Sequence, residues 1–594
     1  MKKIIVSLVL ISLLFGACKN QTQESLQKSA ETTFEPMLKQ YYEQGLLLDP
    51  IKATTSGDNR YDDLFTNALS LQHIEKQKVY YTTYLKKVNS YDKSSLTEEQ
   101  QMSQGVLRWE CERNLERLAF KNHAYFPIDQ MWSPNLFFGQ LASGASAQPF
   151  ETLLDYKKWT QRVDGYLQWL DSAKINMQKG IEQGYVLPKS LIKKVIPQLK
   201  EMTNPVLEQH LFYTPVLNMP ASFSVEDKRE IRKLYSDMII NKVIPTYQSI
   251  HDFVATDYLE SGRESSGIDG VPEGEAYYKH QIKLYTTTDM TAEQIHTLGL
   301  NEVARILSEM EKVKNKIGFK GDLKAFFNEV RSNPILMPFK NPQEVIANFN
   351  AIHTTMKPQL ERLFDRTPKT PFEVRQTEAF REKSASAEYN PGSLDGTRPG
   401  IFYTPIPDAT KYNTYSDESL FLHEAIPGHH YQISLTQENE GLSDFRKTLW
   451  YSGYGEGWAL YCESLGKELG LYTDPYQYFG MLGAEMHRAI RLVVDTGMHT
   501  KGWSREKAIQ YSLDNEAESK ASIVSEIERY MANPGQALSY KVGQLKLQQL
   551  RAKAKKQMGD RFDIREFHNQ VLETGCIPLA LLEDKINRWI ADAK

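Results

Sequence analysis

The sequence predicts a mainly α-helical protein, a large multi-helix body with a small β-sheet. Apolar residues recur at three- and four-residue steps over long stretches, as in residues 231–239, which is the period of helices that bury one face. Two segments rich in turn-forming residues, 261–275 and 386–404, interrupt this pattern. The second segment ends in the run Gly400–Thr404, which we expect to form a short strand because it follows turn signals and is apolar and aromatic.

Composition indicates a globular protein. The chain has 594 residues, of which 41% are hydrophobic and 25% are charged, so it has ample material for a large core. Its formal net charge is -4, and it has no long basic run or pattern typical of RNA or DNA binding. We therefore expect no nucleic-acid partner.

The N-terminus has the pattern of an export signal. Met1–Lys3 carry positive charge, Ile4–Phe15 are apolar, and small residues precede Cys18. This order resembles a bacterial lipoprotein signal, which implies a signal peptide over residues 1–17, lipidation of Cys18 and a polar tether over residues 18–32. The protein would then be anchored to a bacterial membrane in the cell envelope, on its periplasmic or surface side. The alternative is an ordinary signal peptide that is cut nearby.

The remaining chain offers neither a second membrane segment nor a disulfide framework. After the signal no run of eighteen apolar residues occurs. Three cysteines follow Cys18, namely Cys111, Cys462 and Cys576. Because an odd number cannot pair completely, we interpret them as buried thiols.

Helical signals divide the mature chain into two parts, an N-terminal helical region over residues 33–260 and a catalytic region over residues 276–594. Residues 261–275 lie between them and form either a linker or a mobile loop over the site. In the second part, Thr291 with Gln294 predicts a capped helix start. Asp474-Pro475 predicts another, since Asp favours the cap and Pro the first helical position.

Chemistry concentrates in His423-Glu424-Ala425-Ile426-Pro427-Gly428-His429-His430. In an H-E-x-x-H helix the two imidazoles bind zinc and the glutamate is the general base. Here Pro427 stands where the second imidazole would be, and a proline breaks a regular helix. If Pro427 and Gly428 are looped out, His429 becomes the second ligand. If the helix continues through a kink, His430 competes; we favour His429.

Several stretches resemble the bacterial family DUF885. They are HEAIPGHHYQ with EGWALYCE at 456–463, GTRPGIFYTPIPD at 396–408, RLVVDTGMH at 491–499, PGQALSYKVGQLKL at 534–547 and FHNQVLETGCIPLALLE at 567–583. The proteins of that family look like distant relatives of the gluzincin zinc metallopeptidases, whose metal ligands are His, His and Glu. The resemblance implies a zincin-like pair of active-site helices beside the sheet. It also implies that Gly400–Thr404 is an edge strand that pairs with the substrate backbone; the alternative is a plain hairpin in a small sheet.

A zinc site of this kind needs a third protein ligand and leaves one position for water. Glu456 is the first candidate, and its flanking glycines would let the backbone approach the metal. Glu463, two turns later, is the alternative ligand; otherwise we expect it to orient a ligand imidazole.

The same resemblance suggests catalytic roles. Glu424 would take a proton from the attacking water and deliver it to the leaving amine. Tyr540 is the first candidate to donate to the carbonyl oxygen as it gains charge, and His499 is the second. Arg491 and Asp495 are spaced to form an ion pair on one helix face; alternatively Arg491 grips a substrate carboxylate.

These observations predict a lipid-anchored, Zn2+-dependent peptidase that hydrolyses short peptides. Two other functions stay open. One is a metal-dependent hydrolase of another amide or ester. The other is a non-catalytic helical lipoprotein whose metal site is structural and recruits a fourth side chain, such as His430 or a cysteine.

Overall fold

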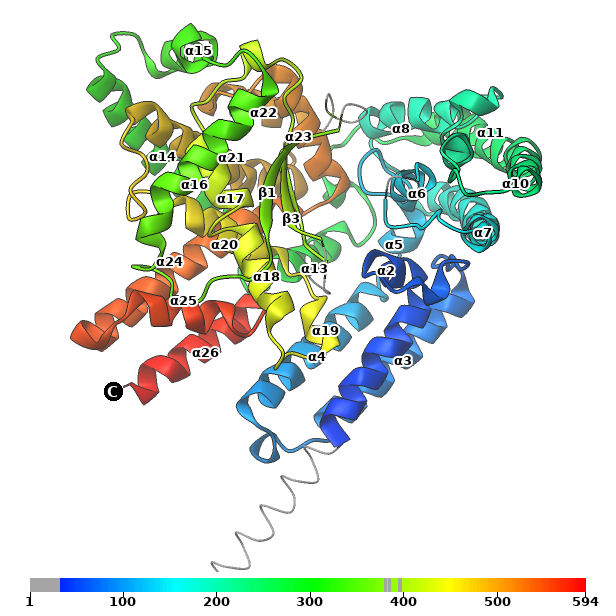
Figure 1. Ribbon diagram of the computed structural model, residues 1–594, viewed down its shortest axis with the longest axis horizontal. Coiled ribbons are helices and arrows are strands. Elements are labelled where there is room, and N and C mark those ends of the chain that lie inside the picture. Colours follow the sequence, from blue (N-terminus) through cyan, green and yellow to red (C-terminus); the bar gives the residue numbers. More distant parts are fainter. Residues whose placement is uncertain (1–32, 145, 379–381, 383–385, 394–397, 594) are drawn as a thin grey trace, which may run out of the picture.

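The protein is mainly α-helical with one small sheet, as predicted, in a computed structural model (Figure 1). The structure describes residues 33–144, 146–378, 382, 386–393 and 398–593. The predicted signal peptide, Cys18 and the tether lie outside the described residues.

The N-terminal half is a succession of helices with short connections. After a helix over residues 33–48 come α2 (Pro50–Thr55), α3 (Leu71–Asn89), α4 (Glu98–Arg117), α5 (Asn122–Tyr125), α6 (Pro134–Ala142), α7 (Leu153–Gln183), α8 (Lys189–Glu201), α9 (Thr214–Leu217), α10 (Val225–Met238), α11 (Ile244–Phe253) and α12 (Leu259–Ser261). A π-helical segment, Ile239–Val243, joins α10 to α11 and ends two residues before Pro245.

The second half carries more helices and all three strands. They are α13 (Gly274–Thr286), α14 (Ala292–Ile317), α15 (Leu323–Ser332), α16 (Pro342–Leu360), β1 (Phe372–Gln376), β2 (Glu388–Asn390), β3 (Gly400–Thr404), α17 (Asp417–Glu424), α18 (His429–Glu438), α19 (Asp444–Lys447), α20 (Ser452–Glu463), α21 (Pro475–Thr500), α22 (Arg505–Asn515), α23 (Lys520–Ala532), α24 (Ser539–Met558), α25 (Ile564–Leu572) and α26 (Leu579–Asp592).

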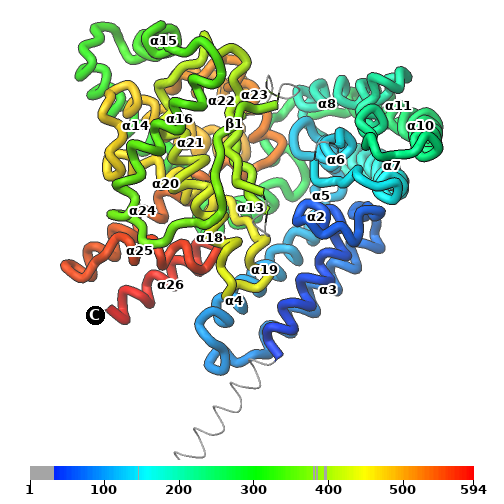
Figure 2. The backbone as a smooth tube through the Cα atoms, viewed as in Figure 1, coloured from blue at the N-terminus to red at the C-terminus, as the bar shows by residue number. Residues whose placement is uncertain are grey.

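Two large hydrophobic cores organise these helices. One core joins the first helices, including α3 and α4, to the helices of the C-terminal half. The other is formed almost entirely within residues 128–258 and is rich in aromatic side chains. Figure 2 shows α6, α7, α8, α10 and α11 grouped on one side of the molecule, away from α14, α16 and α24. We call this group, α6–α11, the side lobe, and the rest of the helices the main body.

The strand prediction is confirmed, but its predicted role as an edge strand is wrong. β3 has the expected bounds, and it is the central strand of the order β1-β3-β2. It pairs in parallel with β1, Phe372 opposite Gly400, and antiparallel with β2, Tyr389 opposite Phe402. Both of its edges are therefore occupied by other strands of the sheet. The pairing partner β1 begins 28 residues earlier in the chain, which strand propensity at β3 alone does not reveal.

The predicted helix starts are confirmed. Thr291 and Gln294 form a reciprocal capping box at α14, and the side chain of Asp474 caps α21 with Pro475 at its first turn. The three cysteines Cys111, Cys462 and Cys576 are buried free thiols, as predicted.

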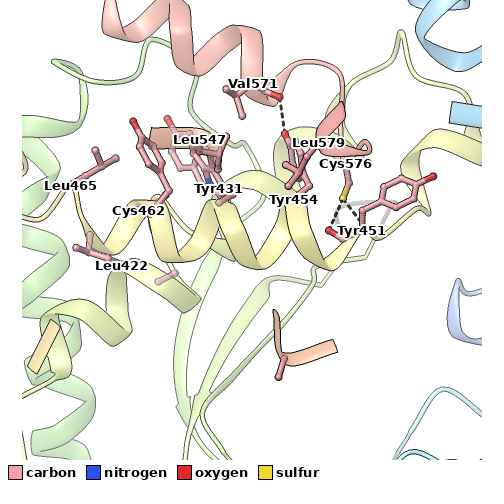
Figure 3. Packing of buried hydrophobic residues seen from close by; sticks show 14 of the residues in the cluster. Leu422, Tyr431, Tyr451, Tyr454, Cys462, Leu465, Leu547, Val571, Cys576 and Leu579 are labelled. Atoms are coloured by element: carbon pink, nitrogen blue, oxygen red, sulfur yellow. Dashed lines mark hydrogen bonds between the residues drawn. The ribbon is translucent and has the colours of Figure 1, made fainter. Parts of the chain in front are cut away.

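Two glycine contacts bring α20 and α24 together. A Cβ on Gly457 would lie 2.6 Å from the Cα of Gly543, and a Cβ on Gly543 would lie 1.9 Å from the carbonyl oxygen of Gly453. The glycine after Glu456 is therefore needed for helix packing, rather than for backbone approach to a metal as we expected. The same N-terminal end of α20 is also fixed to the C-terminal segment, where Tyr454 donates to the carbonyl of Val571 and the backbone N–H of Tyr451 donates to Cys576 (Figure 3).

Candidate metal centre

The HEAIPGHH stretch forms two helices with a break between them. α17 ends at Glu424 and α18 begins at His429. The intervening residues are therefore looped out, as the alternative with His429 as the second ligand requires. A Cβ on Gly428 would lie 1.9 Å from the carbonyl oxygen of His423, so only glycine permits this close return of the chain. The indole of Trp458 donates to the carbonyl of Pro427 at 2.9 Å and fixes the loop between the two helices.

The break brings His423, His429 and Glu456 together. One ligand atom from each lies within 4.8 Å of the others. A carboxylate oxygen of Glu456 is 3.6 Å from Nε2 of His423 and 3.4 Å from Nε2 of His429. Two ligands bonded at about 2.0–2.1 Å to one tetrahedral zinc would stand about 3.4 Å apart. The three side chains could therefore hold a metal ion, and the two separations from Glu456 match those expected between ligands of one tetrahedral zinc.

His430 faces a different part of the molecule. Its Nδ1 lies 2.9 Å from the hydroxyl of Tyr389 on β2, and its ring packs against Phe372 of β1. A Cβ on Gly400 would lie 2.7 Å from that Nδ1. The side chain therefore connects α18 to the sheet, and His429 is the histidine that lies beside His423.

Glu463 contacts the histidine pair from behind. Its carboxylate lies 2.7 Å from Nδ1 of His423 and is buried. Burial lowers the pKa of His423, but the contacts with Glu456 and Glu463 more than offset it and raise the pKa to about 9. A histidine that binds a metal is neutral, and when its Nδ1–H donates to a carboxylate the lone pair of Nε2 is the one left for the metal. Of the two roles considered for Glu463, metal ligand and orienting group for an imidazole, this geometry fits the second.

Glu424, the last residue of α17, is buried next to the three ligand candidates. Burial raises its pKa, and the neighbouring His423 and His429 partly offset that effect. A buried carboxylate with a raised pKa is a stronger base than a solvated glutamate.

Tyr540 and His499, the two predicted oxyanion donors, have different surroundings. The ring of Tyr540, at the start of α24, lies 4.5 Å from the guanidinium carbon of Arg491. Burial and the charge of Glu456 raise the pKa of Tyr540, which keeps its hydroxyl protonated as a donor. His499 is fully buried, and its ring nitrogens contact the backbone N–H of Ile268 at 2.9 Å and the carbonyl of Tyr530 at 3.1 Å. Both nitrogens are used for structure, so the prediction for His499 is wrong.

The contact with Ile268 also settles the place of residues 261–275. A Cβ on Gly267 would lie 2.0 Å from the carbonyl oxygen of Met498, so this segment is docked tightly against α21. This docked position favours the linker over the mobile loop of the two alternatives.

The predicted pair of Arg491 with Asp495 does not form. Arg491 donates to Glu526 at 2.9 Å and to the hydroxyl of Tyr530 at 2.9 Å. Asp495 accepts from the hydroxyl of Tyr278 and from the backbone N–H of Gly535. The same-face spacing is correct, but α13 and α23 supply stronger partners. Arg491 is thus held in place beside Tyr540.

A cavity of about 130 Å³ lies between α17 and α21 and reaches His423. The small residues Gly483 and Ala484 leave this space open, and His487 and Arg488 line it on the side of α21. The cavity therefore reaches His423 from the side of Glu463, and neither His429 nor Glu456 lines it.

One residue at the centre was missed by sequence reasoning. Trp450 lies with its ring centroid 5.7 Å from that of His429, yet it precedes α20 and belongs to no motif. The only signal in the sequence is that Trp450 is an aromatic residue six positions before Glu456.

The model of the family described as "Bacterial protein of unknown function (DUF885)" matches residues 50–586. The chain belongs to the DUF885 family. No curated protein matches this DUF885 chain.

Two solved structures are similar to this DUF885 protein over almost its whole length. One is a protein from Colwellia psychrerythraea, provisionally named a lipoprotein, with 27% identity, a TM-score of 0.86 and coverage of 95% of this chain and 99% of the other. The second, from Shewanella oneidensis, is provisionally named a lipoprotein of unknown function and has 18% identity, a TM-score of 0.71 and coverage of 93% and 99%. The second likeness extends to the fold alone.

Within the described part of the chain, none of the helices combines the length and apolar character needed to cross a membrane.

Proposed function

We propose that this protein is a zinc-dependent peptidase that hydrolyses short peptides. The observation that carries the proposal is the convergence of His423, His429 and Glu456 directly beside Glu424. Three protein ligands are the number that catalytic zinc sites use, whereas structural sites use four. The side chains that would serve as a fourth ligand have other partners: His430 contacts Tyr389, and Cys462 contacts the carbonyl of Pro427.

A bound zinc ion would supply a Lewis acid that polarises the substrate carbonyl and lowers the pKa of a coordinated water towards about 7. The protein's own residues would do the rest. Glu463 holds Nδ1–H of His423, so that Nε2 faces the metal position. Glu424 takes the proton of the attacking water and passes it to the leaving amine. Tyr540, kept protonated by its raised pKa, donates to the carbonyl oxygen as that oxygen gains charge.

The decisive test compares the wild type with Glu424→Gln. Metal content is measured by mass spectrometry, and cleavage of a mixed library of short peptides is followed by product analysis. We expect about one zinc per chain in both proteins, with cleavage lost by at least about a hundred-fold in the variant, at the lower end of general-base contributions.

Three outcomes separate this proposal from its alternatives. Undiminished cleavage by Glu424→Gln rules out this residue as the base. Hydrolysis of esters or other amides without peptide cleavage favours the broader hydrolase. Zinc retention with no hydrolysis of any of these substrates favours a structural metal site.

We also propose that Cys18 carries a lipid that anchors the protein in the cell envelope. The support is the signal pattern at the N-terminus and the lipoprotein names given to both similar structures. Expression of Cys18→Ser in a bacterial host should move the protein from the membrane fraction to the soluble fraction of the envelope. An unchanged membrane fraction in this variant would contradict the anchor.

A further inference from the structure

Trp450 is a large aromatic side chain exposed at the candidate centre. It keeps 44% of its surface accessible, although its ring contacts that of His429 at 5.7 Å and 54°. His429 itself is 8% exposed. The accessible part of the indole therefore belongs to a ring that packs against a candidate metal ligand.

The position of this indole is fixed by its neighbours. A Cβ on Gly455 would lie 2.2 Å from the six-membered ring of Trp450, so the indole rests directly on the first turn of α20. The next residue, Tyr451, is buried, and its hydroxyl donates to Glu110 at 2.7 Å while its backbone N–H donates to Cys576. The indole is thus held in one orientation before any ligand arrives, which reduces the entropy lost when a ligand packs on it.

We propose that Trp450 forms an apolar subsite for the substrate side chain next to the scissile bond. This inference rests on the proposed peptidase function and specifies its substrate class: peptides with a leucine-like or aromatic residue at one of the two positions that flank the cleaved bond. Aromatic faces bury large apolar areas at little conformational cost. A substrate held at the metal would cover the indole surface that water now contacts.

The first part of the experiment measures cleavage. Two series of otherwise identical short peptides carry Leu or Ser at each flanking position. The wild type should prefer Leu at one of them, and Trp450→Ala should reduce that Leu-to-Ser ratio of kcat/KM by about ten-fold. Trp450→Phe should keep most of the preference. Trp132→Ala, which removes another exposed tryptophan (58% accessible) in the loop before α6, should leave the ratio unchanged.

A role for Trp450 in merely holding His429 predicts something else. It would lower the rate on Leu and Ser peptides equally and reduce the zinc content of Trp450→Ala. That outcome overturns the subsite, as does a wild type without any preference between the two residues.

The second part measures binding without catalysis. The zinc-loaded Glu424→Gln protein is titrated with the same peptides by calorimetry, with and without Trp450→Ala. A Leu peptide that binds about ten-fold more weakly after loss of the indole supports the subsite even if no peptide is cleaved, in which case only the peptidase proposal fails. Equal affinity in both proteins, or no binding of any peptide, overturns the subsite.

Discussion

The side lobe and the candidate centre both bury charged side chains, but they use them differently. In the side lobe, Arg162 on α7 is fully buried and all of its nitrogens donate to neighbours, among them Gln148 at 2.7 Å and the hydroxyl of Thr54 at 2.9 Å. At the candidate centre, Glu456 faces His423 and His429 at 3.4–3.6 Å, which is longer than an ordinary hydrogen bond.

This difference separates structural from functional burial. A buried charge whose nitrogens all donate to neighbours, such as Arg162, contributes to the fold and has little capacity left to bind a ligand. Side chains that converge without bonding tightly to one another leave room for an additional atom between them. Burial and charge alone would not distinguish the two regions; the distances between donors and acceptors do.

The largest expected effect is the loss of the metal when a converging ligand is removed. His429→Ala should bind zinc far more weakly than the wild type, beyond the roughly 10–100-fold effect of altering a residue behind a ligand. His430→Ala, its neighbour and matched control, should retain zinc because its side chain faces Tyr389. Zinc affinity is measured by competition with a chromophoric chelator. Equal losses in the two variants would contradict the assignment of His429.

In the side lobe, the corresponding change should affect stability alone. Arg162→Met removes a buried cation and leaves Asp62, 3.6 Å away, without its charged neighbour. We expect a loss of about 3–5 kcal/mol in the free energy of unfolding, with unchanged zinc stoichiometry. The matched control is Arg565→Met, which removes an exposed pair with Asp563 and should leave the free energy of unfolding nearly unchanged. A change in zinc content for Arg162→Met would contradict this prediction, because it would show that the side lobe affects the metal centre.

A smaller effect is expected from the carboxylate behind His423. Glu463→Gln keeps an acceptor for the imidazole but removes its charge, so zinc affinity should fall by about 10–100-fold. Glu468→Gln, which alters an exposed partner of Arg551 five residues later, serves as the control. If both variants bind zinc like the wild type, the contact at 2.7 Å between Glu463 and His423 does not tune the metal.

The sequence predicted the parts of the molecule that depend on local rules. Capping residues placed the starts of α14 and α21, and turn signals placed β3. The break at Pro427 and Gly428 could also be predicted from backbone chemistry. It limited the candidates for the second metal ligand to His429 and His430.

What failed depended on partners far away in the chain. β3 is central because β1 approaches from an earlier segment. Arg491 and Asp495 are spaced to pair, yet Glu526 and Tyr278 from other helices are nearer partners. His499 is occupied by the backbone of residue 268, which is 231 positions away. Trp450 belongs to no motif, and only the fold places it beside His429.

The smallest expected effect comes from a buried acid of the main body that takes no part in the centre. Burial raises the pKa of Asp495 to about 7, although Tyr278 and Gly535 donate to it. The folded state therefore holds a proton that the unfolded chain releases near pH 4. Between about pH 4 and pH 7 the unfolded state binds fewer protons, so this group makes the free energy of unfolding fall as pH rises.

Asp495→Asn mimics the protonated carboxyl at every pH and should remove this dependence. Each unit of pKa shift corresponds to about 1.4 kcal/mol, so we expect the variant to gain on the order of 1–3 kcal/mol relative to the wild type between pH 5 and pH 8. Urea unfolding at both values checks this, and parallel pH dependences of the two proteins would contradict it. Zinc content should be equal in both, because Asp495 bonds to α13 and to the loop before α24 rather than to the three converging side chains. Asp495 thus belongs with Arg162: both are buried charged groups whose removal changes stability and leaves the metal centre intact.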